Sequence, residues 1–193
     1  MNYIKYKGTL MAGLIDMIIN NPAIVKSIAK QVGIDPDDAG SIIGKLAPIL
    51  MGGAKSNLDS DKDSGKLIKK IESSNYSDIF NKPEEHINDK NFKDIGNDIL
   101  SDLTGSKENS REVARHVEKE TGISSSIIKS VLPMLAPMII GALTNKSSSS
   151  LNNSNTNTNS TSITDILSNL IDQDQDGSAI DDIMGMATKF IFK

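Results

Sequence analysis

Two stretches of the chain carry the same pattern at a constant offset of 89 residues (122 − 33 and 141 − 52). The first contains Gly33-Ile34, Leu46-Ala47-Pro48 and Gly52, and the second contains Gly122-Ile123, Leu135-Ala136-Pro137 and Gly141. A glycine that ends one helix, followed by a second helix, is typical of a helix–turn–helix unit. A proline inside the second helix removes a backbone hydrogen bond and favours a bend. We therefore expect an internal pseudo-repeat of two kinked apolar helices.

No segment shows a sustained alternation of apolar and polar residues, so the sequence predicts an all-α fold, a multihelical bundle. We expect a short helix over about 13–19, a second from Pro22 that ends at Gly33, and a third that Asp35 caps. Two or three shorter helices follow between 66 and 105, with breaks near 73–75 and 82–83. Their apolar residues are Leu67, Ile68, Ile71, Ile95, Ile99, Leu100 and Leu103.

The second unit is expected to begin with Asn109 as a helix cap, because Glu112 follows three residues later in a variant of the capping box. Ser124 then caps a helix that is apolar on nearly every face, from Ile127 to Leu143. A helix without a polar face is usually buried. We predict that this helix forms the centre of the core.

Composition divides the chain into four segments. Residues 1–10 are expected to be a disordered leader or a non-native start before Met11, and residues 11–146 form the helical domain. Residues 147–160 are rich in Ser and Asn, which predicts a flexible linker. Residues 161–193 are predicted to form an acidic helical tail with two short amphipathic helices.

The residue content of the chain excludes several kinds of binding site and argues against several cellular locations. There are no cysteines, so disulfides and cysteine-based zinc sites are excluded. No secretory signal is evident. The longest apolar run, 130–143, is shorter than the about 20 residues that cross a bilayer, so we expect no transmembrane segment and a cytoplasmic protein.

The negative charge is concentrated at the C-terminal end. Residues 151–193 hold six acids and two lysines, a balance of −4 that equals the net charge of the whole chain. The remainder is neutral, so it has no general attraction to nucleic acid or to an anionic membrane.

Segment 25–45 nevertheless resembles a DNA-binding helix-turn-helix, with Gly33 at the turn. Its second helix opens with Asp35, Asp37 and Asp38, and carboxylates at that place would repel phosphates. DNA binding is kept as an alternative function, although the charge argues against it.

The clearest chemical pattern is the acidic run Asp172, Asp174, Asp176, Gly177 and Ser178. Alternating acids followed by glycine match the first half of a calcium loop, in which three carboxylates and a backbone carbonyl bind the ion. The usual acid at the twelfth position is replaced by Ile183, so Asp182 or Asp181 would complete the shell. We predict a calcium site at Asp172, Asp174, Asp176, Ser178 and Asp182. The alternative is a helix start capped by Asp176, with the other acids solvated.

No catalytic constellation is visible. His86 and His116 have no nucleophile or metal ligand nearby in the sequence, and we expect both to be exposed and without partners. An enzyme would need a site assembled from carboxylates of separate helices.

Several motifs resemble one bacterial family. They are 11–16 (Met-Ala-Gly-Leu-Ile-Asp), 33–36 (Gly-Ile-Asp-Pro), Leu46-Ala47-Pro48 with Gly52-Gly53, 132–137 with Gly141, and 176–187. Together they resemble the YidB-like family, domain of unknown function 937, over about 11–146 and the tail. The resemblance implies a multihelical bacterial protein and brings no established activity or catalytic residues. Members often carry a glycine where this chain has Gln175, which weakens the expectation of tight metal coordination.

The two apolar helices and the missing catalytic set predict a non-enzymatic domain. We expect a protein-interaction or self-assembly module with a calcium-responsive tail, acting on itself or on a protein partner. DNA binding and a carboxylate-based enzyme stay as alternatives.

Overall fold

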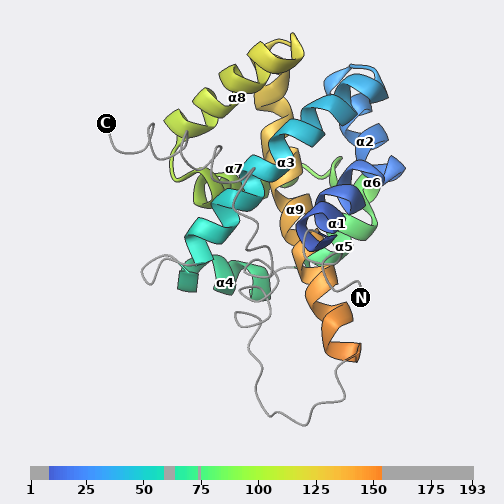
Figure 1. Ribbon diagram of the computed structural model, residues 1–193, viewed down its shortest axis with the longest axis vertical. Coiled ribbons are helices and arrows are strands. Elements are labelled where there is room, and N and C mark those ends of the chain that lie inside the picture. Colours follow the sequence, from blue (N-terminus) through green and yellow to red (C-terminus); the bar gives the residue numbers. More distant parts are fainter. Residues whose placement is uncertain (1–8, 59–63, 74, 154–193) are drawn as a thin grey trace, which may run out of the picture.

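The computed structural model in Figure 1 describes residues 9–58, 64–73 and 75–153. Within these ranges the chain forms nine helices and no strand, which confirms the all-α prediction. The helices are α1 (Thr9–Ile19), α2 (Pro22–Val32), α3 (Pro36–Leu58), α4 (Ser64–Ser73), α5 (Tyr76–Asn81), α6 (Pro83–His86), α7 (Phe92–Thr104), α8 (Lys107–Thr121) and α9 (Ser125–Asn153).

Helix α9 is the centre of the bundle. Every residue from Val131 to Leu143 is buried, as expected for a helix that is apolar all round. Helices α1, α2, α3, α5, α7 and α8 all pack against it. Figure 1 shows α9 running lengthwise through the molecule with the other helices gathered around it. The prediction that this helix forms the core is confirmed.

Two helix pairs have bounds that follow the 89-residue offset. Helix α2 ends at Val32 and α8 at Thr121, while α3 begins at Pro36 and α9 at Ser125. Gly33 and Gly122 cap the first helix of each pair with φ of 73° and 74°. This left-handed conformation costs other residues about 1 kcal/mol or more, so glycine is favoured at both turns. The pseudo-repeat, as a duplicated packing unit, stays a prediction.

Both long helices run without interruption through their prolines, Pro48 in α3 and Pro133 and Pro137 in α9. Because Pro137 has no N–H, the carbonyl of Pro133 loses the donor that an α-helix would supply. Gly96 of α7 lies against this carbonyl. A Cβ built at Gly96 would be 2.7 Å from the carbonyl carbon of Pro133 and closer still to its oxygen. Helix α7 therefore touches α9 backbone to backbone.

The same type of contact occurs at two other glycines. A Cβ at Gly53 of α3 would be 2.8 Å from the carbonyl carbon of Leu103 in α7. A Cβ at Gly141 of α9 would be 2.8 Å from the Cβ of Phe80 and would overlap with the carbonyl oxygen of Tyr76 in α5. Three glycines thus let α7 and α5 approach the two long helices at distances that exclude any side chain.

Several sequence predictions of helix bounds need correction. The first helix begins at Thr9 and not near Gly13, and it continues through this glycine without a break. Four helices, α4 to α7, lie between residues 64 and 104 instead of two or three, although both predicted breaks are present. Ile95 is 39% exposed and does not belong to the core.

The cap of α8 is Ser106, not Asn109. The Ser106 side chain accepts a hydrogen bond from the Asn109 N–H at 3.1 Å, and the Asn109 amide donates to the Thr104 carbonyl at 2.8 Å. Serine and asparagine are caps of similar strength, so the pattern alone did not separate them.

Helix α9 continues to Asn153, into the segment predicted as the linker 147–160. Extending an existing helix avoids the cost of nucleation, so Ser and Asn residues can continue it. The rest of that segment, the tail 161–193 and leader residues 1–8 lie outside the described residues.

Gly96→Ala tests the contact between α7 and α9. The added methyl group would overlap with the Pro133 carbonyl, and overpacking of this kind costs about 1–3 kcal/mol of unfolding free energy. Gly52→Ala is the matched control, because a Cβ there meets nothing within 4 Å and alanine favours a helix by about 0.5–1 kcal/mol. Urea denaturation should show a loss of stability for the first variant and none for the second. Equal stability of Gly96→Ala and wild type would contradict this packing.

Candidate interaction groove

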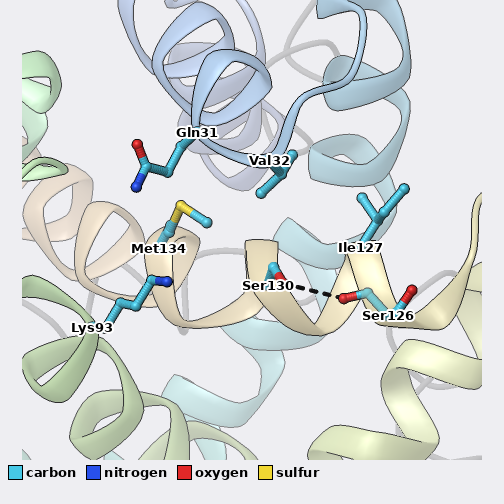
Figure 2. Close-up of a pocket in the computed structure, with 7 residues that line it drawn as sticks. All are labelled: Gln31, Val32, Lys93, Ser126, Ile127, Ser130 and Met134. Atoms are coloured by element: carbon cyan, nitrogen blue, oxygen red, sulfur yellow. Dashed lines mark hydrogen bonds between the residues drawn. The ribbon is translucent and has the colours of Figure 1, made fainter.

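A shallow groove lies where the end of α2 meets the starts of α7 and α9. Its volume is about 310 Å³. Residues from three helices line it: Gln31 and Val32 of α2, Lys93 of α7, and Ser126, Ile127, Ser130 and Met134 of α9. Figure 2 shows these side chains around a common space, with Met134 between Gln31 and Lys93. We call it the α2–α7–α9 groove.

Two glycines determine where the lining residues of α2 and α7 lie. Gly33 ends α2, so Gln31 and Val32 occupy the last turn of that helix. Lys93 precedes Gly96 by three residues, one helical turn, and the contact of Gly96 with Pro133 holds this end of α7 on α9. The position of Lys93 over the groove therefore depends on the glycine.

The lining is amphipathic. Met134 is 2% exposed, while Val32 and Ile127 are half-buried and pack on the core. Gln31, Lys93, Ser126 and Ser130 are polar and exposed, and the Ser130 hydroxyl donates to the Ser126 carbonyl at 3.2 Å (Figure 2). Among the residues that the structure describes, Lys93 makes no ion pair. The groove thus offers an apolar floor and an available cation at its rim.

A carboxylate lies at the start of α9. The Ser125 N–H donates to Oε1 of Glu118 at 2.8 Å, and the hydroxyls of Ser124 and Ser126 are 2.9 Å apart. Glu118 therefore occupies the first N–H of α9. The positive charge beside the groove comes from Lys93.

The prediction that both histidines lack partners is wrong. Nε2 of His86 is 2.8 Å from Oδ2 of Asp78, and Nε2 of His116 is 3.1 Å from Oε1 of Glu120. The hydrogen bond from His86, helped by the Lys82 ammonium, holds the pKa of Asp78 below its usual value. The α5–α6 turn brings His86 back over Asp78, eight residues earlier, which a sequence alone does not reveal.

His116 belongs to a charged cluster that joins α8 to α3. Nζ of Lys45 lies 2.9 Å from Oε2 of Glu120, and this hydrogen bond, together with the charges of Lys45 and His116, lowers the pKa of Glu120. A second cluster places Nζ of Lys70 between Asp98 and Asp102, at 2.8 and 2.6 Å. Burial alone lowers the pKa of Lys70, but its bonds to the two carboxylates outweigh burial and raise it. In each cluster a lysine of one helix pairs with carboxylates of another, Lys45 joining α3 to α8 and Lys70 joining α4 to α7.

The comparisons with known proteins give one match. The model of a bacterial protein family of unknown function, DUF937, matches residues 16–146, more than half of the chain. The chain belongs to this family. This confirms the family expected from the repeated motifs. No curated protein and no solved structure matches.

The family match places the groove inside the DUF937 region, since all seven lining residues fall within 16–146. Sequence reasoning did not find the groove, because three separate helices contribute to it. The predicted calcium residues Asp172, Asp174, Asp176, Ser178 and Asp182 lie outside the described residues. Within the described part of the DUF937 protein, no group of three or more acids or histidines could hold a metal ion.

The segment proposed as a DNA-binding unit, 25–45, does form two helices joined at Gly33. Asp35, Asp37 and Asp38 are exposed at the start of α3, where they would meet a phosphate backbone. In the described ranges one helical stretch, Ser125–Asn145, is long and apolar enough to cross a membrane. However, 78% of its apolar window is buried inside the DUF937 bundle, as in the core helix of a soluble protein.

Asp78→Asn tests the pair with His86 through its pH dependence. Because the folded pKa of Asp78 is lowered, the pair stabilises the protein above the unfolded pKa of about 3.9 and is lost as pH falls through the folded pKa. Thermal melts should show the variant less stable than wild type at about pH 6 and equal to it at about pH 2.

Asp94→Asn is the control, since Asp94 also lies in the first turn of a helix and makes no ion pair with described residues. A pH-independent difference between Asp78→Asn and wild type would contradict the pair.

Proposed function

We propose that this DUF937 protein is a non-enzymatic, helix-mediated interaction module of the cytoplasm, and that the α2–α7–α9 groove binds an amphipathic helical segment. The observation that carries the proposal is the groove itself, with a partly buried apolar floor beside the available cation of Lys93. Recognition of an amphipathic helix uses apolar anchors in a groove and polar groups at its rim.

The dimensions of the groove support a protein segment as ligand. Its floor consists of Val32, Ile127 and Met134, which is sufficient for one or two aliphatic anchors. Methionine adapts to different apolar partners because its side chain is unbranched. The polar rim and the shallow form favour a helix that rests on the surface with acids near Lys93.

A designed peptide tests this function. The ligand is a fifteen-residue amphipathic helix, one version with acids and one with lysines on its polar face, titrated into the full chain. We expect the acidic version to bind more tightly than the lysine version, and Lys93→Glu to reduce this preference by about tenfold, because a rim ion pair becomes a repulsion.

Lys90→Glu is the matched control, since Lys90 is exposed in the turn before α7 and does not line the groove. The proposal fails if neither peptide binds any variant, or if both charge reversals change the preference between the peptides equally.

We further propose that calcium binds the tail through Asp172, Asp174, Asp176, the Ser178 carbonyl and Asp182. The sequence supports this, because five acids within eleven residues repel one another when ionised and a divalent cation offsets that repulsion. Calorimetry should detect a site that Asp174→Ala and Asp176→Ala together abolish. Asp165→Ala, outside the run, should leave it intact. Neither heat nor a change in melting temperature with millimolar calcium would refute the site.

A further inference from the structure

We propose that the α2–α7–α9 groove is occupied by residues 178–192 of the same chain, so that the tail occludes the interaction site. This inference rests on the proposed function, because it names the occupant of that groove. Three observations support it: the residue pattern of the segment, the length of chain that connects it to α9, and the charges on both sides.

The segment has the pattern that the groove requires. Ile180, Ile183, Met184, Ala187 and Ile191 recur at intervals of three or four residues, which places them on one face of a helix. Asp181 is next to this apolar stripe, while Asp182 and Lys189 fall on the opposite side. A helix that seats its aliphatic face on Val32, Ile127 and Met134 would thus carry Asp181 at the rim, where Lys93 lies.

The connecting chain is long enough. Helix α9 ends at Asn153, and Ser130 in the groove lies 23 residues earlier, about 35 Å along the helix. The 24 residues from 154 to 177 span up to about 80 Å. The other amphipathic segment of the tail, near 162–172, follows only eight residues, which reach at most about 28 Å. Residues 178–192 are therefore the segment that can reach the groove.

Charge also favours this occupant. Residues 151–193 carry a balance of −4 on a bundle that is otherwise neutral, and Lys93 is a cation without an ion pair among the described residues. Linkage within one chain raises the effective concentration of the tail to the millimolar range, so even a weak contact would be populated. An external helical partner would then have to displace the tail.

The absence of cysteine makes a single-label experiment direct. Asn97 is exposed on α7 one helical turn after Lys93, so Asn97→Cys places an environment-sensitive fluorophore at the rim without replacing a lining residue. In the full chain, Met184→Glu should release the tail, shift the emission towards that of a solvated probe, and tighten binding of the acidic peptide by about tenfold or more.

Lys189→Glu is the control. It changes the charge of the tail by more than Met184→Glu does, but Lys189 lies off the apolar stripe. The emission should therefore stay unchanged.

An exchange of charges between groove and tail gives a second readout. Lys93→Glu and Asp181→Lys should each release the tail, and the double variant should restore the wild-type emission.

The outcomes separate this inference from the proposed function. If the acidic peptide binds but Met184→Glu changes neither emission nor affinity, the groove is an interaction site and the tail is not its occupant. If the emission of the wild-type protein depends on protein concentration, the occupant is a second copy, and occlusion within one chain is refuted. Failure of the peptide to bind any variant, the tail-released one included, would refute the proposed function.

Discussion

The contact between Gly96 and the Pro133 carbonyl determines how the bundle is assembled. Pro137 leaves this carbonyl without its helical donor, and a polar group that is buried without a partner costs about 1–3 kcal/mol. The glycine lets the α7 backbone come close enough for a Cα–H to face the oxygen, a weak but recurrent contact between helices. The proline inside α9 and the glycine inside α7 therefore form one structural device, although 41 residues separate Pro137 from Gly96.

The groove follows from this device. Because α7 is held against α9 at Gly96, Lys93 lies above the first turns of α9, and the last turn of α2 closes the other side. The rest of α9 is covered by α1, α3, α5 and α8, and its residues from Val131 to Leu143 are all buried. A buried core helix thus contributes both the stability of the fold and the apolar floor of an interaction site.

Polar contacts at the periphery hold the smaller helices in place. Asn145 of α9 accepts a hydrogen bond from the Ser77 hydroxyl and donates one to Asn81 at 3.0 Å, which fixes α5 at both ends. The cluster of Lys45, Glu120 and His116 links α3 to α8. Such exposed pairs each contribute little to stability, but together they specify which helix faces pair.

The sequence alone determined the helical class, the central role of residues 131–143 and the turns at Gly33 and Gly122, because these depend on local propensity and on apolar periodicity. It did not determine the cap at Ser106 or the extent of α9, since these depend on competition between similar local choices. Nor did it determine the partners of His86 and His116, of which the first depends on the α5–α6 turn. The groove could not be predicted at all. Gln31, Lys93 and Ser130 are far apart in the chain, and only the packing of α7 against α9 through a glycine brings them to one surface.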